Sequence, residues 1–135
     1  MSFLRISHIA IAVDDLDAAS KAFETLVGNK VEQFQDVSDQ KVRVGMLPVG
    51  ESRLELAGPT DPSSTVAKFI RNRGEGIHHI CFEVADITAE LARLKKAGFQ
   101  IIDDQPRKGA DGHLIAFLHP RTTGGVLIEL SEKLK

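Results

Sequence analysis

Two histidines and two glutamates recur at matching places in the two halves of the chain. Residues 8–18 read HIAIAVDDLDA and residues 79–89 read HICFEVADITA, which pairs His8 with His79. The segments RLEL and LIEL likewise pair Glu55 with Glu129. Two neutral imidazoles and two carboxylates form a ligand set that suits a borderline divalent metal, and the carboxylates balance its charge. These four residues are therefore predicted to bind one divalent metal ion.

The segments around these residues indicate an internal duplication. Helix-like stretches at 16–26 and 87–97 follow the two histidine strands, and Gly28 and Gly98 are placed to end them. VRVGMLP (42–48) then resembles LIAFLHP (114–120), with a proline closing each run. Four matches in the same order predict that each half runs strand, helix, strand, strand, strand.

This repeat predicts an α+β protein made of two tandem βαβββ modules, at about 6–58 and about 76–131. A turn-rich connector and a short helix, expected at 65–73 with Ser63 or Ser64 as its N-cap, fill residues 59–75. A half of about 55 residues cannot easily bury one sheet face alone. Residues 1–135 are therefore expected to form a single domain.

The alternation of side chains along a strand predicts where the four candidate ligands point. His8 shares a row with Ala10 and Ala12, opposite the apolar row that should pack against a helix. By the same rule His79, Glu55 and Glu129 face away from the helices. A pseudo-twofold relation between the halves should then bring the two histidine–glutamate pairs together.

Each of these residues alone has an ordinary structural interpretation. A single strand histidine is often a hydrogen-bonded structural residue, and a glutamate between two leucines is often the solvated side of an edge strand. Their recurrence at equivalent positions favours the metal site, because two buried carboxylates without a cation would repel each other. His78 falls on the opposite strand face, and His113 and His119 have no clear role; a polar strand-end position is the safer interpretation of His119.

The composition excludes several other classes of protein. The chain has 17 basic and 19 acidic residues, so it lacks the basic excess of a nucleic-acid-binding protein. Cys81 is the single cysteine, and no intrachain disulfide is possible. No stretch reads as a signal peptide or a membrane span, which leads us to expect a cytoplasmic protein with no membrane partner.

Several blocks of the sequence resemble the vicinal oxygen chelate superfamily and, within it, the methylmalonyl-CoA epimerases. The blocks are HIAIAVDDLDAA (8–19), LPVGESRLEL (47–56), SSTVAKFI (63–70), GEGIHHICFEV (74–84) and AFLHPRTTGGVLIEL (116–130). The resemblance implies the glyoxalase fold, a curved and mostly antiparallel sheet around a metal site. It also implies epimerisation of methylmalonyl-CoA, a homodimer, and metal binding by His8, Glu55, His79 and Glu129. Cobalt is the metal we expect first, with manganese, nickel or zinc as alternatives.

The resemblance also assigns roles in proton transfer. It implies that Glu129 is the base that acts at C2 of the substrate. Several epimerases carry a second acid/base glutamate where this chain has Val44, and a valine cannot transfer a proton. Glu55, the repeat partner of Glu129, is our candidate for the second group, and a metal-held water is the competing hypothesis.

Two other functions stay open at this point. A glyoxalase I-type isomerase would use a similar metal site, although the epimerase-like blocks argue against it. A non-enzymatic small-molecule-binding member of the superfamily would commonly lack the complete ligand set. Four cations could approach the CoA moiety or could be ordinary solvated charges, and they are Lys68, Arg71, Arg107 and Lys108.

Overall fold

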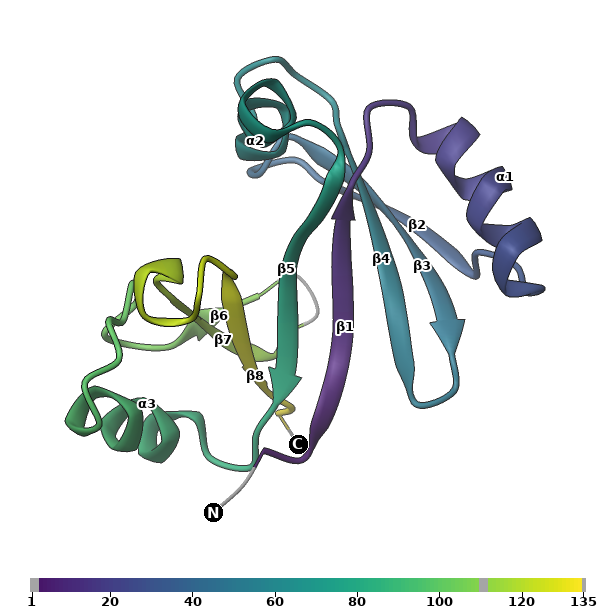
Figure 1. The fold of residues 1–135 in the computed structure, drawn as a ribbon. Coiled ribbons are helices and arrows are strands. Elements are labelled where there is room, and N and C mark those ends of the chain that lie inside the picture. The colour runs from purple at the N-terminus through teal and green to yellow at the C-terminus, as the bar shows by residue number, and fades with distance from the viewer. Residues whose placement is uncertain (1–2, 110–111, 135) are drawn as a thin grey trace. The chain divides into compact units, whose positions relative to one another are not determined.

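The computed structural model describes residues 3–109 and 112–134 (Figure 1). Strands and helices alternate along the chain in two similar series. Their bounds are β1 (Arg5–Ala12), α1 (Leu16–Val27), β2 (Gln33–Val37), β3 (Val42–Val49), β4 (Ser52–Pro59), α2 (Thr65–Arg73), β5 (Gly76–Glu83), α3 (Ile87–Lys96), β6 (Arg107–Lys108), β7 (Leu114–Leu118), the short 3₁₀ helix η1 (Pro120–Thr122) and β8 (Ile128–Glu132).

The chain divides into two compact units. The N-terminal unit is His8–His78, and the C-terminal unit combines Met1–Ser7 with His79–Lys135. In the described part of each unit the strand pairs are antiparallel except one, β1 with β4 in the first and β5 with β8 in the second. A mixed but mostly antiparallel arrangement is therefore found in both.

In the N-terminal unit the strands follow the order β2-β3-β4-β1. Asp15 caps the start of α1 by accepting the backbone N–H of Ala18. Helix α1 packs on β3 and β4 (Figure 1). The strand face beneath it carries Leu47 and Leu56, which are completely buried. Gly58 permits this close packing, because a Cβ atom there would lie 3.1 Å from Cβ of Leu16. The helix therefore covers one face of the unit and leaves the other for the row that contains His8.

The connector before α2 is shaped by local hydrogen bonds. Asp61 accepts both the backbone N–H and the hydroxyl of Ser63, and these bonds, with Lys41 nearby, lower the pKa of the Asp61 carboxyl. Ser64 then caps α2 by accepting the N–H of Ala67. The short helix at 65–73 and one of its two candidate caps are thus confirmed.

In the C-terminal unit the strands follow the order β5-β8-β7-β6. Helix α3 packs through Ile87, Leu91 and Leu94 against the strand residues Leu118 and Leu130. These side chains are almost fully withdrawn from solvent, so they form the apolar core of this unit. The opposite sheet face carries His79 and Glu129.

The first residues of the chain belong to the C-terminal unit. The rings of Phe3 and Phe82 lie 5.1 Å apart, and the backbone N–H of Leu4 donates to the carbonyl of Glu83. Arg5 Nε lies 2.7 Å from Glu83 Oε1. The predicted first module begins at about residue 6, so these three residues lie outside both predicted modules.

The helices predicted at 16–26 and 87–97 are confirmed within one residue at their ends. Gly28 ends the first with a φ of 81°, as expected. The second ends at Lys96 with Ala97 as its C-cap, and Gly98 follows with a φ of 97°. Gly98 thus turns the chain just beyond the helix.

The prediction was wrong in the segment after Gly98. A strand was expected there, but Ile101 makes only an isolated bridge to Leu118. The strand of this region is instead the short β6, formed by Arg107 and Lys108. Side-chain bonding explains part of the difference, because Asp103 Oδ2 accepts the backbone N–H of Phe117 where a strand carbonyl would otherwise do so.

The single-domain assignment stays a prediction, and it has a measurable consequence. A unit of about 60 residues buries only about 60% of the surface that its unfolded chain exposes, so neither unit should be stable alone. We expect one cooperative unfolding transition in urea. The slowest-exchanging amides of both units should give the same free energy of opening, equal to that of global unfolding. Two separate transitions would contradict the assignment.

No helix in the described part of the chain combines the length and apolar character needed to cross a membrane.

Candidate metal centre

The first histidine–glutamate pair lies within the N-terminal unit. Strands β1 and β4 pair in parallel, with Ala10 opposite Glu55 and His8 opposite Arg53. Residues opposite each other share a sheet face, so His8 and Glu55 project from the same side. Nε2 of His8 lies 3.4 Å from Oε2 of Glu55, and the two side chains are only 11% and 17% exposed.

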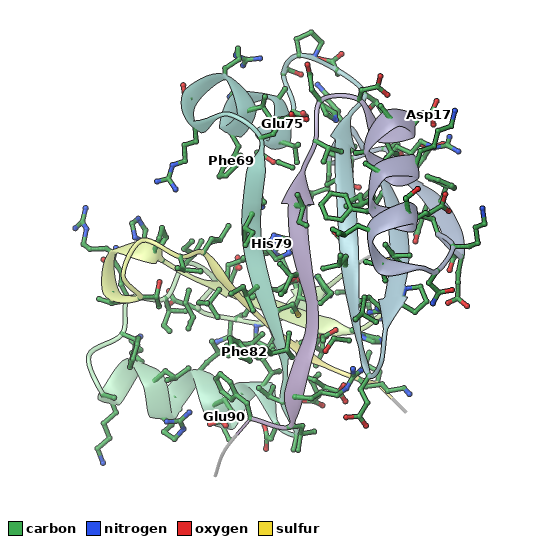
Figure 2. The ribbon with its side chains drawn as sticks, turned by 45° about the vertical axis from the view of Figure 1, so that its right-hand side comes forward. Asp17, Phe69, Glu75, His79, Phe82 and Glu90 are labelled. Atoms are coloured by element: carbon green, nitrogen blue, oxygen red, sulfur yellow. The ribbon has the colours of Figure 1, made fainter. Side chains whose placement is uncertain are left out.

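The second pair lies within the C-terminal unit and repeats this arrangement. Cys81 is opposite Glu129 in the parallel pairing of β5 with β8, and His79 shares the face of Cys81. Nε2 of His79 lies 3.0 Å from Oε1 of Glu129, and these side chains are 11% and 10% exposed. Figure 2 labels His79 about midway along β5 and Phe82 nearer its C-terminal end. The edge of the His79 imidazole also contacts the ring of Phe117.

The spacing within each pair suits two ligands of one cation. With ligand bonds of about 2.1 Å, neighbouring ligand atoms lie about 3.0 Å apart at a right angle and about 3.4 Å apart at a tetrahedral angle. The distances in the two pairs, 3.0 Å and 3.4 Å, match these values. A neutral imidazole nitrogen that faces a carboxylate also needs a proton or a cation between them. The spacing within each pair is therefore one that two ligands of a single cation would have.

The chemistry of the buried donors points to a divalent ion. The buried donors are His8 in the N-terminal unit and His79 and Glu129 in the C-terminal unit. They are 9%, 9% and 7% exposed as whole residues. Imidazole and carboxylate ligands accommodate cobalt, manganese, nickel and zinc, so the ligand types alone do not select one metal.

The remaining histidines differ in their surroundings. Nδ1 of His119 accepts the backbone N–H of Arg121 at 3.0 Å and caps η1, which agrees with the strand-end role expected for it. The ring of His78 lies 5.0 Å from that of Phe69 on α2. His113 places Nδ1 3.3 Å from the hydroxyl of Ser131, two residues beyond Glu129 on β8.

The position where several epimerases carry a second acid/base glutamate is apolar here. Val44 is opposite Ala57 on β4, on the sheet face of Glu55. It is 5% exposed and lies in a cluster with Ala12, Val42 and Val66. This position therefore carries no side chain that could transfer a proton.

The sequence assigns no role to the cations near these faces. Arg53 is half-buried and faces the same side as His8, a position that strand alternation alone indicates. Arg107 lies in β6, a strand that the sequence did not predict. Lys68 is exposed on α2, and Arg71 donates to the carbonyl of Pro62.

The chain belongs to the Glyoxalase/Bleomycin resistance protein/Dioxygenase superfamily, whose family model matches residues 7–117. The α+β class and the glyoxalase fold predicted from the sequence are thereby confirmed.

Its relatives within that superfamily include acyl-CoA epimerases. It is 40% identical over 130 residues to the ethylmalonyl-CoA/methylmalonyl-CoA epimerase of Cereibacter sphaeroides, covering 95% of this chain and 97% of the relative. The methylmalonyl-CoA epimerase of Mycobacterium tuberculosis superposes with a TM-score of 0.89 at 34% identity, over 98% of this chain and 90% of the other. A variant of the Streptomyces coelicolor methylmalonyl-CoA epimerase in complex with 2-nitronate-propionyl-CoA gives a TM-score of 0.86 at 38% identity, over 98% and 96% of the two chains.

Proposed function

We propose that this protein is a metal-dependent epimerase that interconverts (2R)- and (2S)-methylmalonyl-CoA. The observation that carries the proposal is a buried histidine–glutamate pair at ligand spacing in each unit. The similarity to acyl-CoA epimerases supports the choice of substrate, because it extends over 95% of the chain. In this proposal His8, Glu55, His79 and Glu129 together bind one divalent ion, with cobalt as the first expectation.

The reaction removes a carbon-bound proton beside a thioester and returns it to the opposite face. A divalent ion supplies Lewis-acid stabilisation for the negative charge that develops on the substrate oxygens. Glu129 takes the C2 proton, and its burial keeps bulk water away from the carboxylate. His79 and Glu129 would bind the same ion, because Nε2 of His79 lies 3.0 Å from the carboxylate oxygen.

A second group must deliver the proton from the other side, and we assign this role to Glu55. Glu55 has the same relation to His8 that Glu129 has to His79, with a separation of 3.4 Å. Val44, on the same sheet face, has no proton to give. A bound water is the competing donor.

The Glu55→Gln variant tests this assignment. Glutamine keeps the size and the oxygen ligand of the side chain but cannot carry the proton. We expect conversion between epimers to fall by about 10²-fold or more. Deuterium should still enter C2 of the epimer whose proton faces Glu129. Chiral analysis of the product in deuterated water measures both processes, and near-normal epimerisation by the variant would exclude Glu55 as a base.

The proposal as a whole is tested by offering the protein pure (2R)-methylmalonyl-CoA and following the appearance of the (2S) epimer. Ethylmalonyl-CoA and the glutathione thiohemiacetal of methylglyoxal serve as alternative substrates. Turnover of the thiohemiacetal alone would indicate a glyoxalase I-type enzyme. Tight binding without turnover of any of the three would indicate a non-enzymatic binding protein. A cytoplasmic homodimer is part of the same proposal and is checked by the mass of the protein in solution.

A further inference from the structure

The sheet face that carries His79 and Glu129 in the C-terminal unit also carries an arginine. Phe117 is opposite Glu129 where β7 pairs with β8. On the next strand, Arg107 is opposite Ile115, two residues from Phe117 on β7. Opposite residues and residues two apart share a face. Arg107 therefore projects on the same side as the proposed catalytic glutamate.

Two contacts fix the position of this arginine. Its guanidinium carbon lies 5.8 Å from the centre of the Phe117 ring. Its Nε donates to Oδ1 of Asp103 at 3.4 Å. Asp103 is itself held, because its other carboxylate oxygen accepts the backbone N–H of Phe117 at 2.9 Å. The hydrogen bond to Asp103 and the contact with the Phe117 ring therefore hold the Arg107 side chain in one position.

The anchored arginine remains able to bind a ligand. Its side chain is 48% exposed, while that of Asp103 is only 19% exposed. The bond to Asp103 uses Nε, whereas the two terminal nitrogens are suited to bind a carboxylate through two parallel hydrogen bonds. An exposed guanidinium on a fixed stem is well suited to recognise an anion.

The aromatic ring of Phe117 connects this arginine to the candidate metal centre. The His79 imidazole meets the same ring edge-on, with a centroid separation of 5.6 Å and an interplanar angle of 82°. One ring therefore contacts both the guanidinium and a proposed metal ligand. An anion bound by Arg107 would lie on the face from which His79 and Glu129 project.

We infer that Arg107 binds the free carboxylate of the malonyl group, an inference that rests on the proposed function. Arg107 thereby selects malonyl-type acyl-CoA over a neutral acyl-CoA. In methylmalonyl-CoA this carboxylate is attached to the reacting carbon, whereas the CoA phosphates lie at the far end of the pantetheine arm. The positive charge of Arg107 also offsets the repulsion between Glu129 and an anionic substrate.

Lys108 provides a matched control one residue away. It carries the same charge and is also exposed, but it is opposite Leu114, whose side chain packs on the α3 core. Lys108 therefore lies on the other face of the same strand. Its removal changes the net charge as much as the removal of Arg107 does.

The test compares two ligands that differ only in the carboxylate, racemic methylmalonyl-CoA and propionyl-CoA. Dissociation constants are measured by calorimetry for the metal-loaded wild type, Arg107→Ala, Arg107→Lys and Lys108→Ala. We expect Arg107→Ala to weaken methylmalonyl-CoA binding by about 10- to 100-fold and to leave propionyl-CoA binding unchanged. Arg107→Lys should be intermediate, because an ammonium keeps the charge but not the bidentate geometry. Lys108→Ala should bind both ligands as the wild type does.

Three outcomes would overturn the inference. If Arg107→Ala weakens the binding of methylmalonyl-CoA and propionyl-CoA equally, Arg107 contacts a CoA phosphate instead. If the affinity for both ligands is unchanged, Arg107 does not contact the substrate. An equal effect of Lys108→Ala would reduce the role of Arg107 to general charge attraction. Preserved propionyl-CoA binding is also the control for folding. A wild type that binds neither ligand and does not epimerise would instead reject the proposed function.

Discussion

Replacing Glu129 by glutamine is expected to slow proton exchange at C2 of methylmalonyl-CoA by about 10²–10⁴-fold. The Glu129 side chain is 10% exposed, and one carboxylate oxygen lies 3.0 Å from His79 Nε2. A glutamine keeps the size of the side chain and an oxygen ligand, so the loss should arise mainly from the missing base. Deuterium incorporation followed by mass spectrometry measures the rate.

Two further measurements separate a lost base from a lost metal. The metal content of Glu129→Gln, determined on the purified protein, shows how much of the site remains. Glu32→Gln is a suitable control, because Glu32 is exposed and its backbone N–H, rather than its side chain, donates to the carbonyl of Met46. A Glu129→Gln variant that keeps its metal and exchanges protons within a few-fold of the wild-type rate would exclude Glu129 as the base.

Removing the metal is the change with the second large expected effect. Without a cation, Glu55 and Glu129 present only negative charge to an anionic substrate, and each lies beside an imidazole that needs a proton or a cation. We expect C2 exchange to fall to the background rate in chelator-treated protein and to return when cobalt is added. The free energy of unfolding should also be lower without the metal. The expected difference is about 2.7 kcal/mol when the loaded protein is measured at a metal concentration of a hundred times the Kd.

The arrangement within each histidine–glutamate pair was predictable because it rests on short-range periodicity. Strand residues alternate faces, so the positions of His8 and Glu55 within their strands determine the side to which they point. The duplication then supplied the matching pair, His79 and Glu129. The helix ends were predictable for a similar reason, since Asp15, Asp86 and Ser64 are local capping residues.

The features that escaped prediction depend on contacts between residues distant in sequence. Phe3 and Arg5 associate with the second half through Phe82 and Glu83, about 78 residues away, and no local pattern encodes such a partner. Strand β6 has two residues, which is too short for a period of two to be visible. The face of Arg107 therefore became clear only from its pairing with Ile115.

The most direct test of this account is proton-to-deuterium exchange at C2 of methylmalonyl-CoA in deuterated water, measured with metal-free and then with cobalt-loaded protein. The account predicts rapid exchange with the cobalt-loaded protein and background exchange with the metal-free protein. Absence of exchange from protein that has bound the metal stoichiometrically would contradict the proposed epimerase activity, and equal exchange in both forms would contradict the metal centre.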